Sequence, residues 1–120
     1  MFDIYDPAVE VHEAPSLPYG GRFLGHDGVV EHGLRYAAAW DRLQTVDDRR
    51  LEAEFHPFGE RVLVRWRQKA HLGEEALDHP MLSVYLVQGG RVVESRMHAF
   101  DSAALASFLA AAAGADAVRR

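Results

Sequence analysis

Two adjacent glycines, Gly89 and Gly90, separate two runs of residues that favour β-strands, at 81–88 and 91–100. A two-glycine connection is typical of a tight β-hairpin, because glycine readily adopts the positive φ angles that such turns need. This pair restricts the fold more than any other feature of the chain. Counting back from the turn, the regular register pairs Val84 with Ser95 and Leu82 with Met97.

Three further strands and two helices are predicted around this hairpin. The strands are expected at 8–13, 51–58 and 61–71, with an irregular loop at the Pro- and Gly-rich residues 14–21. One helix is expected at 28–43 after the N-cap Asp27, and another from Asp101 or Ser102 to Gly114. The order strand, helix, four strands, helix predicts one α+β domain over 1–120, in which a curved sheet carries helices on one face.

Composition excludes several classes of protein. The 120 residues contain no cysteine, which rules out disulfides and thiolate chemistry. A net charge of −5 argues against nucleic-acid binding. We expect no membrane span, because no apolar run approaches about 20 residues. The N-terminus does not resemble a signal peptide, which favours a cytoplasmic location. The seven histidines show no paired metal-ligand spacing, so neither a metal nor a cofactor is expected.

Three segments, "YDPAVEVHEAPSLPYGG", "GHDGVVEHGLRYAAAW" and "GGRVVESRMHAFDSAALASFL", together resemble the nuclear transport factor 2-like (NTF2-like) superfamily. The similarity is to its SnoaL-like and ketosteroid-isomerase-like members. It implies a cone-shaped α+β fold with a mixed or antiparallel sheet curled round a pocket, and a convex sheet face that often forms a dimer. The family's long N-terminal helix is absent or very short here, and its helix-borne tyrosine has no counterpart. The pocket is therefore expected to be more open, or covered by the C-terminal tail or a partner subunit.

Glu13 interrupts an otherwise apolar strand face. Val9, Val11 and Glu13 alternate with Glu10 and His12, so the carboxylate falls on the side that should face the core. In ketosteroid-isomerase-like proteins the first strand ends in a carboxylate before a proline, and "VHEAP" resembles that strand end. The resemblance implies that Glu13 is a general base, helped by a pKa that an apolar pocket would raise. The alternative is that Glu13 caps the following loop.

The rest of the family's catalytic residues are not matched. String alignment places Ser83 at the position of the oxyanion-stabilising acid, whereas the hairpin register places Val84 there, and neither is an acid. In cyclase-like members a histidine and an aspartate occupy the last strand, where this chain has Ser95 and Met97. An oxyanion hole built on a protonated acid and the acid chemistry of the cyclases are therefore both disfavoured.

Apolar and aromatic residues from several elements are expected to line the pocket beside Glu13, although aromatic residues at these spacings are more often plain core. This expected pocket comprises Val11, Tyr19, Tyr36, Trp40, Phe55, Trp66, Val84, Ser95 and Met97. His12 and Arg96 should point away from it. The predicted outer face, with Glu94, Arg96, His98 and Tyr85, suits a sheet-to-sheet homodimer, and a solvated face is the alternative.

Two functions follow from these observations. The first is a SnoaL-like protein that binds a hydrophobic, cyclic small molecule in its cone, with catalysis left open as an isomerase or a lyase/cyclase that uses Glu13 for proton transfer. The second is a non-catalytic dimeric accessory or protein-interaction module of the same fold. The shape of the pocket and the burial of Glu13 distinguish them.

Overall fold

The structure is a computed structural model that describes residues 2–119, with side chains described for residues 3–115. Six strands form one sheet in the order β2-β1-β6-β5-β4-β3. The strands are β1 (Tyr5–Glu13), β2 (Gly21–Leu24), β3 (Glu54–Phe58), β4 (Arg61–Leu72), β5 (Glu75–Gln88) and β6 (Arg91–Ala99). The helices are α1 (Gly25–Trp40) and α2 (Ser102–Arg119), with short 3-10 turns at Phe2–Ile4 and Asp41–Leu43.

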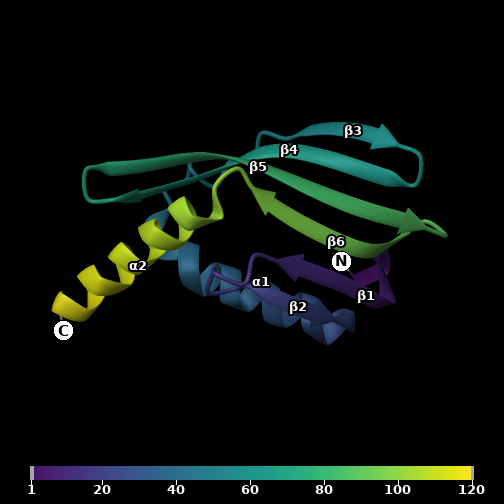
Figure 1. Ribbon diagram of the computed structural model, residues 1–120, viewed down its shortest axis with the longest axis horizontal. Helices are drawn as coiled ribbons and strands as arrows, with labels where there is room; N and C mark the ends of the chain where they lie inside the picture. Colours follow the sequence, from purple (N-terminus) through teal and green to yellow (C-terminus); the bar gives the residue numbers. More distant parts are fainter. Residues whose placement is uncertain (1, 120) are drawn as a thin grey trace.

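The curved sheet has both helices on its concave side, as predicted (Figure 1). Strands β3 to β6 form the expected antiparallel meander. The sheet as a whole is mixed, because β1 pairs parallel with β6 and antiparallel with β2. The first strand therefore lies beside the last one, and Glu13 is brought to the end of the sheet from which α2 departs (Figure 1).

The regular hairpin register proved wrong by one residue beyond the turn. Gln88 pairs with Arg91 and Val87 with Val92, but Leu86 pairs with Glu94, so Val93 forms a bulge. An extra residue in one strand shifts every later pair by one. Tyr85 consequently faces Ser95, and Ser83 faces Met97, where Val84 and Leu82 had been expected.

Several predicted boundaries also shift. The predicted loop ended at Gly21, but Gly21, whose φ is 112°, begins a further strand that pairs with the end of β1 after the 14–20 loop. Helix α1 begins at Gly25, so Asp27 lies in its first turn and is not the N-cap. Asp101 caps α2 as expected, accepting a hydrogen bond from Ala104 N–H at 3.2 Å. Helix α2 continues past Gly114, since one glycine among alanines costs a helix only about 1 kcal/mol.

The main core lies between the two helices and the end of the sheet near Met81. Trp40 of α1 is fully buried and stacks on Phe108 of α2, with ring centroids 6.2 Å apart. Leu105 and Leu109 of α2 are buried beside Tyr19 of the loop between β1 and β2. Within residues 2–119, neither helix is long and apolar enough to cross a membrane.

Candidate functional site

A buried acid–base pair joins the end of β1 to α1. The Oε1 atom of Glu13 lies 3.2 Å from Nε2 of His32. The Glu13 side chain is 2% exposed and that of His32 is 11% exposed. The carboxylate makes no other side-chain hydrogen bond among the described residues, and backbone bonds within the 14–20 loop close that loop without it. Glu13 therefore does not cap the loop, and the arrangement can share or transfer a proton.

Aromatic rings enclose the imidazole of His32. The ring of Phe23 lies edge-on to it with centroids 5.2 Å apart, and those of Tyr19 and Tyr36 lie 6.1 and 6.4 Å away. Sequence analysis missed His32. The available signal was its spacing, because residues 32, 36 and 40 fall on one face of a helix and the other two are aromatic.

Two tyrosines beside Glu13 have strongly perturbed hydroxyl groups. Burial raises the pKa of Tyr36 to about 12, and the negative charge of Glu13 contributes to the increase. Burial raises the pKa of Tyr19 further, again with a contribution from Glu13. Both hydroxyls therefore remain protonated at neutral pH, and that of Tyr19 accepts a hydrogen bond from Trp40 Nε1 at 3.0 Å. Perturbed groups of this kind gather at functional sites more often than elsewhere.

A second buried polar contact lies further along the concave face. Tyr36 donates its hydroxyl hydrogen to Oε1 of Gln68 on β4. Gln68 is almost fully buried, and its Nε2 group has no hydrogen-bond partner in the described part of the chain. An unpaired buried amide group carries a desolvation cost, which a polar group of a ligand would offset.

Serines complete the polar lining of this face. Trp66 Nε1 donates to Ser83 Oγ at 2.9 Å. Burial raises the pKa of Tyr85, whose hydroxyl lies near Ser83 and Ser95, and the buried Oγ atom of Ser95 has no hydrogen-bond partner in the described part of the chain. Tyr85 was predicted on the outer face, and the bulge at Val93 accounts for that error.

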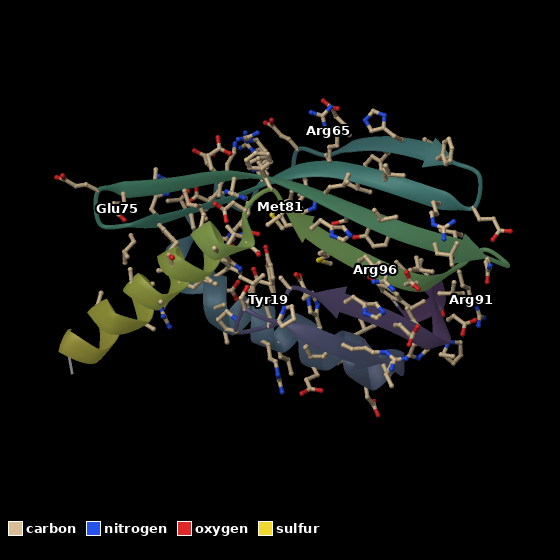
Figure 2. All side chains as sticks on the ribbon, viewed as in Figure 1. Tyr19, Arg65, Glu75, Met81, Arg91 and Arg96 are labelled. Carbon is tan, nitrogen blue, oxygen red and sulfur yellow. The ribbon has the colours of Figure 1, made fainter. Side chains whose placement is uncertain are left out.

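Seven of the nine expected pocket residues lie on the concave side of the sheet, and Met97 is the one of them that lines the space next to Glu13. The residues found on the concave side are Val11, Tyr19, Tyr36, Trp40, Trp66, Ser95 and Met97. Val84 lies on the outer face, opposite Arg96 and Leu63. Phe55 is 66% exposed because β3 is an edge strand. Arg96 is exposed and His12 points away from Glu13, as predicted. Figure 2 shows the outer side of the sheet, where Arg65 extends away from both helices.

The space next to Glu13 is a hollow of about 320 Å³ at the end of β1. Tyr19 and Trp40 are fully buried and fill the deeper part of the cone with side chains. Another hollow, of about 280 Å³, lies between residues 50–54 and β4 and has a largely charged rim. A third, of about 300 Å³, lies between α1 and α2. The hollow at the end of β1 is the one of these three that Glu13 itself lines.

Three potential metal ligands meet on the outer face, where sequence analysis had expected none. Atoms of Glu10, His12 and Glu94 lie within 4.8 Å of one another. Both carboxylates already have cationic partners, since Glu10 bonds to Arg22 and Glu94 to Arg96. These ion pairs would have to break before the carboxylates could bind a cation.

Comparison with known proteins identifies the fold. Neither a protein-family model nor a curated protein sequence matches the chain. Among solved structures, TerC co-crystallised with polyporic acid superposes with a TM-score of 0.72 at 20% identity, covering 90% of this chain and 82% of TerC. An NTF2-like protein from Burkholderia pseudomallei superposes with a TM-score of 0.70 at 24% sequence identity, covering 87% of this chain and 78% of that protein. An NTF2-like protein from Burkholderia thailandensis superposes with a TM-score of 0.71 at 20% sequence identity, covering 89% of this chain and 80% of that protein. The chain therefore has the α+β fold of the NTF2-like proteins.

Proposed function

We propose that this protein binds a small organic molecule beside Glu13 and that the Glu13–His32 pair transfers a proton on that molecule. The observation that carries the proposal is the burial of the pair. A carboxylate that is 2% exposed, with one imidazole as its hydrogen-bond partner, loses hydration that a single contact does not replace. Burial of the ionised carboxylate lowers the stability of the fold, whereas a carboxylate shielded from water suits a general base.

The positions of the residues around the pair suggest a role for each of them. Glu13 accepts a proton from carbon or oxygen of the ligand, as the carboxylate of a general base does. His32 holds the carboxylate in position and balances its charge when protonated. The hydroxyl of Tyr19 accepts a hydrogen bond from Trp40 Nε1, and its own proton has no acceptor among the described residues, so Tyr19 is the candidate donor to an oxygen that gains negative charge. The reaction class is isomerisation or elimination by proton transfer.

Two further observations support a ligand of this kind. The aromatic rings of Phe23 and Tyr19 shield His32 from solvent, and Ala14, Met97 and Ala99 give the hollow next to Glu13 an apolar part that suits a hydrophobic compound. The TerC protein, which shares the fold, was crystallised with the small molecule polyporic acid.

Proton exchange on a simple ketone tests the proposal. In D2O a general base replaces the α-protons of cyclohexanone with deuterium, which proton NMR follows directly. We expect the protein to speed this exchange and Glu13→Gln to remove the effect. Glu10→Gln is the matched control, because Glu10 lies on the same strand but faces outward and bonds to Arg22. Equal exchange by wild type and Glu13→Gln would contradict the proposal.

The second candidate is a dimeric interaction module, which the outer sheet face favours. Leu63, Leu82, Val84 and Leu86 form a half-buried apolar strip on the outer face of β4 and β5. A homodimer through this strip is compatible with either function. Sedimentation at tens of micromolar should show a dimer for wild type and a monomer for Val84→Arg. Ser107→Arg on the exposed side of α2 is the control. A monomeric wild type would remove the dimer proposal.

A further inference from the structure

The hollow beside Glu13 exists because two parallel strands end at different levels. Val11 pairs with Ser95 and His12 with Arg96, and β1 then stops at Glu13. Strand β6 continues to Ala99 before α2 begins at Ser102. The edge of β6 that β1 would cover therefore borders an open space of about 320 Å³. Its lining comprises His12, Glu13, Ala14, Arg96, Met97, His98, Ala99 and Ser102.

The polar side chains that line this hollow, apart from Glu13, can all donate hydrogen bonds. They belong to His12, Arg96, His98 and Ser102. Arg96 uses its Nε–H for Glu94, at 2.6 Å, which leaves the two terminal amino groups of the guanidinium without a bond among the described residues. The Nε2 atom of His12 is buried and has no hydrogen-bond partner within the described chain.

The charges around the hollow also favour a ligand that carries acceptor oxygens. Arg96 carries the one permanent positive charge of the lining, part of which the paired Glu94 carboxylate offsets. The hollow also borders the first turn of α2, an 18-residue helix whose N-terminus is the positive end of its dipole. The one acid in the lining is Glu13, which the proposed function uses as a base. Arg96 points to the outer face and Glu13 to the concave side, so a ligand in this hollow would lie across the uncovered edge of β6, with acceptor oxygens toward Arg96 and a transferable proton toward Glu13.

We propose that this hollow binds the carboxylate of a small cyclic organic acid, with the guanidinium of Arg96 as its main contact. This inference rests on the proposed function, and it names the substrate class as an acid whose ring reaches Glu13. Guanidinium groups bind carboxylates through two parallel hydrogen bonds, and the free edge of Arg96 offers two amino groups for that purpose. The volume suits a molecule with a single ring, at the lower end of the range of ligand pockets.

Benzoate and benzamide provide the test, because they have the same shape and differ in charge. Each is titrated into 15N-labelled protein and followed by amide NMR. We expect benzoate to bind about fivefold or more tightly than benzamide and to shift the amide signals of His12, Met97 and Ala99. Arg96→Gln should remove the preference, and Arg96→Lys should keep part of it. Arg67→Gln is the control, since Arg67 lies on β4 and pairs with Asp78 away from this hollow.

The outcomes separate this inference from the proposed function. Equal affinity for the two probes, or a preference that survives Arg96→Gln, would overturn the carboxylate site even if Glu13 catalyses proton exchange. A benzoate preference that depends on Arg96, together with exchange unaffected by Glu13→Gln, would support the site and contradict the catalytic role. Both Arg96 variants keep an exposed polar side chain, and the dispersion of the same NMR spectra shows whether they fold.

Discussion

Glu13, the last residue of β1, and His32, in the middle of α1, meet at 3.2 Å with both side chains withdrawn from solvent. The two residues are 19 positions apart in sequence. Their contact therefore depends on α1 packing across the end of β1. The helix follows β2 directly, and β2 pairs with β1, so three consecutive elements fix the distance between acid and base.

We predict that Glu13→Gln leaves the free energy of unfolding at neutral pH unchanged or raises it by up to about 1 kcal/mol. Glutamine retains the shape and a hydrogen bond to His32 while it removes a poorly hydrated charge. Urea denaturation measures the difference. A loss of about 2 kcal/mol or more would show that the ionised carboxylate stabilises the fold, and Glu13 would then be a structural residue.

We predict that Tyr36→Phe lowers the free energy of unfolding by about 1–3 kcal/mol, because it removes the one hydrogen bond of the buried Gln68 amide among the described residues. Adding Gln68→Leu should recover part of that loss, since the double variant leaves no unpaired amide. The three variants are compared by urea denaturation. A double variant less stable than Tyr36→Phe would contradict this account.

The register of the β5–β6 hairpin can be checked by cysteine labelling, because the native chain contains no cysteine. We predict slow maleimide labelling of Ser95→Cys and Ser83→Cys, whose positions are buried on the concave side. Arg96→Cys should label quickly, since this side chain is exposed. Labelling is done in dilute solution, where a dimer contact would protect least. Rapid labelling of Ser83→Cys, which the regular register would place opposite Arg96 on the outer face, would contradict the bulge at Val93.

Alkaline titration tests the burial of the tyrosines around Glu13. Burial raises the pKa values of Tyr19, Tyr36 and Tyr85 above their ordinary value of 10.0. A raised pKa stabilises the folded state below the unfolded pKa, and this contribution is lost as pH rises toward the folded value. We therefore predict that stability declines above about pH 10, with these tyrosines ionising as the protein unfolds. Absorbance of tyrosinate and circular dichroism should change together. Ionisation of all four tyrosines near pH 10 in a folded protein would contradict the prediction.

The parts of the fold that local patterns determine were predictable from sequence. The Gly89-Gly90 turn, the strand ending at Glu13 and the Asp101 cap all depend on neighbouring residues, and each is present. The bulge at Val93 was not predictable in this way, because a two-residue turn determines only the pairs next to it.

Contacts between distant elements account for what sequence reasoning missed at the site. Glu13 was identified because it breaks the alternation of a strand. His32 was not, because a histidine in a helix has no visible partner until α1 is placed across β1. Phe55 was expected in the pocket on the basis of its aromatic side chain, but the edge position of β3 leaves it exposed.

The most direct test of Glu13 as a general base is the Kemp elimination of 5-nitrobenzisoxazole. A base removes the C–H proton of this compound while its N–O bond breaks, which releases a coloured cyanophenolate. We predict that Glu13→Gln lowers the rate of the wild-type protein about 100-fold, within the usual range for general-base catalysis. Glu10→Gln, on the outward side of the same strand, should leave the rate unchanged. Equal rates for wild type and Glu13→Gln would contradict the assignment of Glu13 as the base.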